Sequence, residues 1–84
     1  MEHSQRGKDM THKVSVWIEN DFQFNPTAVS LAHHVGCGAL RHYLSVILKA
    51  AAPYSAAWQT AQDMAPNDYD RVDWQEIFDT LTGK

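Results

Sequence analysis

Several features of larger or secreted proteins are missing from this sequence. Its 84 residues include one cysteine, Cys37, which cannot form an internal disulfide and fits a reducing, cytoplasmic setting. No stretch approaches the roughly 18 consecutive apolar residues of a membrane-spanning helix, so no membrane association is expected. The polar first ten residues lack the apolar centre of a signal peptide. A chain this short predicts one domain that needs most of its apolar residues for its own core.

Recognisable catalytic motifs are also missing. There is no glycine-rich phosphate loop, no G-x-S-x-G and no H-E-x-x-H. Cys37 lies near His33, His34 and His42, but a zinc site usually needs four ligands with paired spacing. A Cys/His nucleophile also needs an orienting third group and an oxyanion site. We therefore predict no catalytic residue, no metal and no cofactor, and a protein that is not an enzyme.

The acidic residues are concentrated near the C-terminus, although the net charge of the whole chain is only −3. The acids of that stretch, which only Arg71 opposes, are Asp63, Asp68, Asp70, Asp73, Glu76 and Asp79. Direct binding to nucleic acid is disfavoured, because phosphate contacts need clustered lysine and arginine. An acidic surface suits a basic partner instead. These acids are therefore the candidate partner-binding residues.

The first patterned segment, residues 12–20, has two interpretations. Val14, Val16 and Ile18 alternate with polar residues as in a strand, whereas Val14, Trp17 and Ile18 have helical spacing, with Thr11 as a candidate N-cap. We favour the helix and keep an α+β fold with a strand at 13–19 as the alternative. Residues 1–10 are expected to be a disordered leader or an expression remnant, and residues 11–84 a single small globular domain.

Four further helices are indicated after residue 20. Asn25 followed by proline is a favourable N-cap, and the pair of glycines at 36 and 38 marks a break. Apolar residues then recur with helical spacing over 40–51, until Pro53 ends that helix. A shorter helix is expected over 54–62, followed by a loop over 65–68. The fold predicted from these elements is mainly α, with four to five short helices.

The last predicted helix, residues 74–81, has the clearest boundaries. Asp73 and Glu76 have the spacing of a capping box, with aspartate in the capping role. Gly83 follows as a natural C-terminal stop. A negative charge is favourable near the positive, N-terminal end of a helix. This gives a structural explanation for both carboxylates, beside the possibility that they bind a partner.

Two motifs resemble those of a family of small uncharacterised proteins carried by phages and plasmids. The run THKVSVWIEND at 11–21 resembles the family's T-W-x-V-x-L-W-I-x-N-D opening, with His12 in place of the first tryptophan. The run VDWQEI at 72–77 resembles its closing V-[DN]-W-x-E-I. The resemblance implies a helical opening motif and a mobile-element setting. The family has no established catalytic residues to carry over.

The resemblance and the acidic stretch together predict an inhibitor of a bacterial nucleic-acid-binding defence complex, of the anti-CRISPR type. It would act in the cytoplasm of the bacterial host by stoichiometric binding, with carboxylates in place of phosphates. The partner would be a basic nucleic-acid-binding protein or a CRISPR effector subunit. The alternative is a small regulatory module that binds another protein through an exposed aromatic patch of Phe22, Phe24 and Tyr54.

Overall fold

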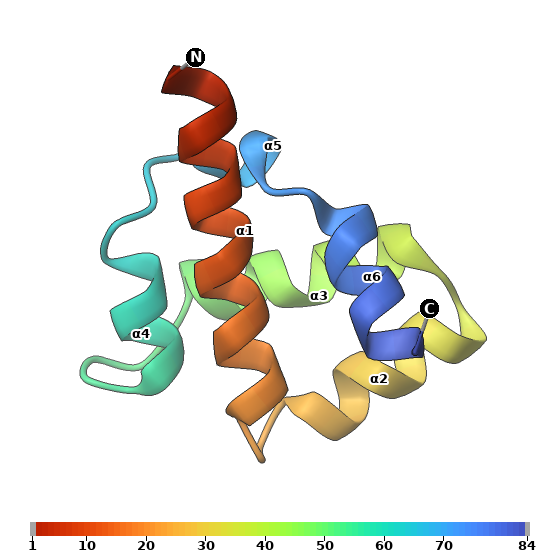
Figure 1. Cartoon of the computed structure of the whole chain (residues 1–84). Helices are drawn as coiled ribbons and strands as arrows, with labels where there is room; N and C mark the ends of the chain where they lie inside the picture. Colours follow the sequence, from red (N-terminus) through yellow and green to blue (C-terminus); the bar gives the residue numbers. More distant parts are fainter. Residues whose placement is uncertain (1, 84) are drawn as a thin grey trace.

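The computed structural model describes residues 2–83, with side chains from residue 5 onward, and this part of the chain contains helices and no strand (Figure 1). The mainly α prediction is confirmed. In chain order the helices are α1 (Glu2–Asn20), α2 (Asn25–His34), α3 (Cys37–Lys49), α4 (Ala56–Ala61), α5 (Asp68–Arg71) and α6 (Trp74–Thr82). None of these helices is long and apolar enough to cross a membrane.

Helix α1 is the element against which most of the others pack. It contacts α2, α4, α5 and α6, and it buries Met10, Val14, Trp17 and Ile18. These positions follow a helical stripe. A strand would place Val16 on the same face as Val14 and Ile18, but Val16 is 45% exposed while the other two are fully buried. The alternative of a strand at 13–19 is therefore wrong.

The N-terminal residues take part in the fold, which differs from the disordered leader expected for residues 1–10. Helix α1 begins at Glu2, Met10 is only 2% exposed, and Arg6 binds the distant Asp68. Thr11, the candidate N-cap, lies inside this helix, where its hydroxyl donates to the Gly7 carbonyl. The segment looks like a leader in sequence because its partners lie at the other end of the chain. Met1 lies outside the described residues.

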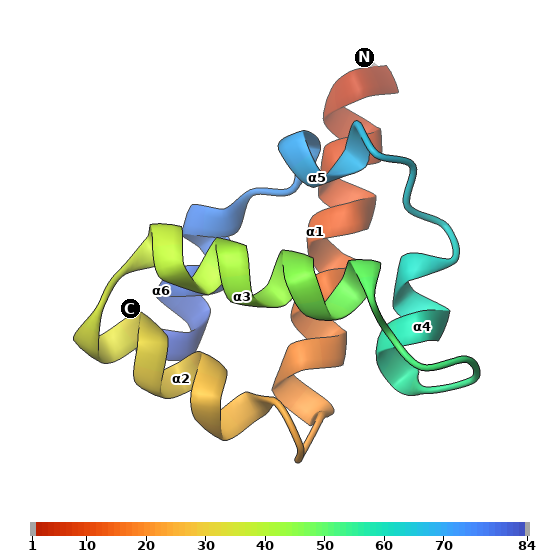
Figure 2. The same cartoon turned by 180° about the vertical axis from the view of Figure 1, so that it is seen from behind.

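Helices α2 and α3 form a pair joined at Gly36, whose φ of 138° is accessible mainly to glycine. The predicted break between them is at this residue. Asn25 does not cap α2; its side-chain amide donates instead to the Ile18 carbonyl at 3.0 Å and ties α2 to α1. The predicted apolar stripe of α3 is buried at Leu40, Leu44 and Leu48. Figure 2 shows α3 lying across the near face of the molecule.

The last helices begin and end close to the predicted residues. Asp73 caps α6 as predicted, by accepting from the Glu76 amide at 3.0 Å, whereas α4 is shorter than the expected 54–62 because Ser55 caps it and it begins at Ala56. Gly83 ends α6 in the left-handed conformation, with φ of 79°. The reciprocal half of the capping box differs, because the Asp73 amide donates to the Thr11 hydroxyl at 2.8 Å. The short helix α5 was not predicted, since its four residues have no periodicity to recognise.

Gly7 is required where α1 passes α5, and this contact gives a stability prediction. A Cβ atom at Gly7 would lie 2.8 Å from the Arg71 carbonyl oxygen, whereas one at Gly38 meets nothing within 4 Å. Gly7→Ala should therefore lower the free energy of unfolding by about 1–3 kcal/mol through overpacking. The matched control Gly38→Ala should raise it by up to about 1 kcal/mol through helix propensity.

Urea denaturation followed by circular dichroism measures both changes. Equal stabilities of the two variants would show that α1 and α5 are not packed this closely.

Candidate functional site

The candidate partner-binding acids do not form one surface. Asp68 is fully buried, so it cannot contact a partner, and its prediction as a surface residue is corrected here. Asp63 and Asp70 are exposed but lie beside basic residues. The remaining acids, Asp73, Glu76 and Asp79, lie along α6.

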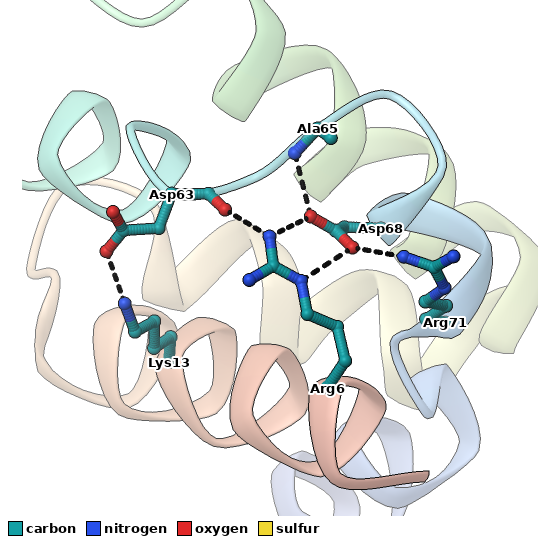
Figure 3. Close-up of polar contacts among 6 residues, drawn as sticks. All are labelled: Arg6, Lys13, Asp63, Ala65, Asp68 and Arg71. Carbon is teal, nitrogen blue, oxygen red and sulfur yellow. Dashed lines mark hydrogen bonds and ion pairs between the residues drawn. The ribbon is translucent and has the colours of Figure 1, made fainter. Parts of the chain in front are cut away.

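Asp68 is the centre of a polar cluster between the N-terminal half of α1 and the segment around α5 (Figure 3). Arg6 binds it with two hydrogen bonds, from Nε to Oδ1 at 3.1 Å and from Nη2 to Oδ2 at 2.7 Å. Arg71 Nη1 donates to Oδ1 at 3.0 Å, and the Ala65 amide donates to Oδ2 at 2.8 Å. Every one of these contacts favours the ionised carboxylate. They hold the pKa of Asp68 well below its usual range, with the Arg6 hydrogen bond as the largest cause.

Asp63 and Asp70 form surface ion pairs. Lys13 Nζ pairs with Asp63 Oδ2, and this hydrogen bond, followed by the lysine charge, lowers the pKa of Asp63 (Figure 3). Arg41 Nη2 lies 2.8 Å from Asp70 Oδ1. The side chains of Asp63 and Asp70 are 60% and 77% exposed, so these pairs are weak and are screened by salt. A basic partner can therefore compete for both carboxylates.

Asp73, Glu76 and Asp79 follow one another at intervals of three residues, which places them along one side of α6. We call these residues the α6 acidic strip. Asp73 and Glu76 are exposed, and Asp79 is half-buried and accepts from the Gln75 side chain at 3.0 Å. Within residues 5–83 none of the strip residues forms an ion pair, and α6 itself contains no lysine or arginine. Among residues 5–83, no basic side chain therefore compensates the negative charge of the strip by direct ion pairing.

The three residues of the candidate aromatic patch differ in how exposed they are. Phe22, in the turn between α1 and α2, is 94% exposed, and Tyr54 is 81% exposed. Phe24 instead packs against the core, with its ring centroid 6.3 Å from that of Trp17. Tyr54 has a φ of 68°, a conformation that is uncommon for a bulky residue, and its ring centroid lies 4.9 Å from that of Trp58. Phe22 and Tyr54 thus remain available at the surface, whereas Phe24 is part of the fold.

An apolar hollow of about 290 Å³ lies next to Phe24. It is lined by residues from the α1–α2 turn, the C-terminal part of α3 and the start of α4, including Val46, Ile47 and the alanines at 50–52. Val46 is itself 50% exposed. Phe22 directly precedes Gln23, which is one of the residues that line this hollow.

Cys37 and its neighbouring histidines differ in exposure. Cys37 is half-buried and packs against the hydrophobic core, while His33, His34 and His42 are exposed. No group of three or more His, Cys, Asp or Glu among the described residues has the geometry to hold a metal ion.

The indole side chains of Trp17 and Trp74 are buried and satisfied. They donate to Asp21 Oδ2 at 2.9 Å and to the Tyr69 carbonyl at 2.8 Å.

Comparison with known proteins gives no relative for this chain. No family model, no curated protein and no solved structure matches it. The family resemblance of residues 11–21 and 72–77 therefore stays a prediction.

The Asp68 cluster predicts a specific dependence of stability on pH. Because the native pKa of Asp68 is lowered, its ionisation stabilises the fold above the ordinary carboxyl pKa of about 4, and this contribution is lost as the pH falls toward the native value. Arg6→Met removes the largest cause of the shift. We expect the variant to be less stable than the wild type near neutral pH, with a difference that shrinks steadily below about pH 4.

Urea denaturation midpoints across the acid range measure this difference. Lys8→Met, which removes an exposed charge from the same helix, is the control and should follow the wild type. A gap between Arg6→Met and wild type that stays constant down to strongly acidic pH would mean that Asp68 is not held ionised by Arg6.

Proposed function

We propose that this protein acts by stoichiometric binding, with the α6 acidic strip (Asp73, Glu76 and Asp79) placed against a basic surface of another protein. The observation that supports this most directly is that the strip residues form no ion pair within residues 5–83. By contrast, Asp63, Asp68 and Asp70 already have basic partners inside the molecule. Uncompensated carboxylates on one side of a helix attract lysine and arginine from a partner.

The strip is carried by a firmly anchored helix. Trp74 is 6% exposed and Ile77 is fully buried, and both belong to the hydrophobic core. The start of the helix is fixed again by the hydrogen bond from the Asp73 amide to Thr11 on α1. A partner therefore binds carboxylates whose backbone is already ordered, which reduces the entropy lost on association.

For the target, we propose a basic nucleic-acid-binding protein of a bacterial defence complex, of the anti-CRISPR type. Carboxylates can occupy positions that such a protein reserves for phosphates, so the inhibitor and the nucleic acid would compete. The support for this target class is the resemblance of residues 11–21 and 72–77 to proteins of phages and plasmids, together with the charge of the strip.

Phage plating tests the proposal in cells. On a strain whose CRISPR system targets the infecting phage, expression of the wild-type protein should restore plaques. The double variant Glu76→Lys/Asp79→Lys should reduce this rescue by at least about tenfold, because like charges facing one another across an interface cost several kcal/mol. Asp73 is left unchanged in this variant, since it caps α6.

Glu19→Lys is the matched control, because Glu19 is an exposed acid on α1 and lies outside the strip. It should rescue the phage like the wild type. Equal rescue by the double variant would contradict a role for the strip, and absence of rescue by the wild type across several CRISPR and restriction types would contradict the target class.

The alternative function, a regulatory module that binds through an aromatic surface, is favoured by one observation. Phe22 is 94% exposed, and its chain neighbour Gln23 lines the apolar hollow at Phe24, so the ring is available as an anchor for a partner.

The variant Phe22→Ser tests whether the Phe22 ring binds a partner or only contributes to the stability of the fold. The substitution should leave the free energy of unfolding within about 0.5 kcal/mol of the wild type, because the ring is almost entirely exposed. Phe24→Ala should instead destabilise the protein by about 1–3 kcal/mol, because that ring packs on the core. If the aromatic surface binds a partner, Phe22→Ser abolishes capture of that partner in a pull-down at high salt. Capture that survives Phe22→Ser and is lost at high salt would favour the strip instead.

A further inference from the structure

One side of α3 carries polar and basic residues that the proposed function does not use. Arg41, Ser45 and Lys49 follow at intervals of four residues and so lie along the same side of the helix, with Gly38 and His42 beside them. Together with residues of the segment 66–70 they line a hollow of about 350 Å³ between α3 and α5. We call this hollow the α3 groove.

The basic groups of the α3 groove are only loosely engaged within the protein. Lys49 Nζ lies 4.8 Å from the centroid of the Tyr69 ring and has no ion pair in the described part of the chain. Burial raises the pKa of Tyr69, so this phenol stays neutral and does not compensate the lysine charge. Arg41 pairs with Asp70, but the side chains of this pair are 49% and 77% exposed. An anion that enters the groove can therefore take Arg41 from Asp70 at little cost.

A second positive element lies at the other end of the α3 groove. Gly38 is in the first turn of α3, a helix of 13 residues whose first turn contains no acid and whose N-cap, Gly36, provides no side-chain acceptor. The amide groups at this end carry partial positive charge. The groove thus combines a helix N-terminus, a guanidinium, a hydroxyl and an ammonium group along one side of α3.

From this placement we propose that the α3 groove binds a small linear polyphosphate anion, with Arg41 and Lys49 contacting phosphate groups at different points along its length and Ser45 donating between them. These two residues are two helical turns apart, or about 12 Å along the axis, which suits an anion with several charges better than a single phosphate. Inorganic tripolyphosphate and the triphosphate of a nucleotide share this chemistry. The inference does not depend on the proposed role of the α6 acidic strip.

The chemistry of the surroundings favours a small anion over a nucleic acid strand. The chain has a net charge of −3, and the α6 acidic strip and Asp63 would repel a long polyanion. A nucleic acid site normally needs lysine and arginine spread over a whole face. The α3 groove has only Arg41 and Lys49 within its lining, together with His42, so its positive charge is confined to the size of a small ligand.

Titration of the full-length protein with tripolyphosphate and, separately, with ATP in the absence of divalent metal tests the inference. We expect saturable changes in the amide NMR signals of residues 38–49 and 66–70 with either probe. Calorimetry should show that Arg41→Gln and Lys49→Met each weaken binding by about tenfold or more, since each removes a charge-assisted hydrogen bond. Binding of tripolyphosphate alone would assign an inorganic ligand, and tighter binding of ATP would assign a nucleotide.

Asp70→Asn is the most discriminating variant. It frees Arg41 and removes a negative charge from the groove, so it should tighten binding by several-fold, whereas Lys8→Met on α1 should leave the affinity unchanged. All of these positions are exposed, and circular dichroism verifies that each variant folds.

Three results would overturn the inference: no saturable change with either probe, equal affinity in Lys49→Met and wild type, or signal changes in the groove with a single-stranded oligonucleotide alone.

Discussion

The carboxylate of Asp68 is a buried negative charge, and the position of the N-terminal half of α1 depends on how that charge is satisfied. Burial of an ionised group is costly unless it is paired and hydrogen-bonded. Here Arg6 comes from α1 and Arg71 from α5, so the two guanidinium groups bring both elements to one point. The same carboxylate accepts from the Ala65 amide and so fixes the turn that leads into α5. One side chain thereby joins the two ends of the chain.

The contacts around this cluster explain why α6 starts where it does. Beside Arg6, the backbone of α1 at Gly7 approaches the carbonyl of Arg71 too closely for any larger residue. One turn further along, the Thr11 hydroxyl donates to the Gly7 carbonyl and accepts from the Asp73 amide. Asp73 is in turn the N-cap of α6. The position of the α6 acidic strip is therefore determined by α1, through the same few residues that surround Asp68.

The sequence predicted the features that depend on neighbours within a few residues. The buried leucines of α3, the Asp73 cap of α6 and the glycine stop at Gly83 are all local patterns. The Asp68 cluster could not be predicted in this way, because Arg6 and Asp68 are 62 positions apart. Nothing in the local sequence separates a buried Asp68 from an exposed Asp70 two residues later.

The same limit applies to the candidate binding surface. Along residues 63–79 of the sequence, only Arg71 opposes the acidic residues. The other basic residues are not counted there, because Arg6 lies in the segment predicted to be a leader and because Lys13 and Arg41 are far away in sequence. The fold pairs Asp63, Asp68 and Asp70 with these distant cations. The acids that form one region in the sequence therefore have different roles in the structure. Asp68 anchors the fold, Asp63 and Asp70 form surface ion pairs, and the remaining three form the α6 acidic strip.

The helix that carries the α6 acidic strip and the helix that carries the α3 groove lie on opposite sides of the molecule. Helix α6 lies toward the viewer in Figure 1, and α3 lies toward the viewer in Figure 2, which shows the molecule from behind. Asp70 on α5 borders the α3 groove, where it forms an exposed ion pair with Arg41. A partner that recruited Asp70 would free Arg41, and an anion that recruited Arg41 would free Asp70. Because such coupling must act equally in both directions, a cation bound at Asp70 would raise the affinity of Arg41 for an anion, and an anion bound at Arg41 would raise the affinity of Asp70 for a cation.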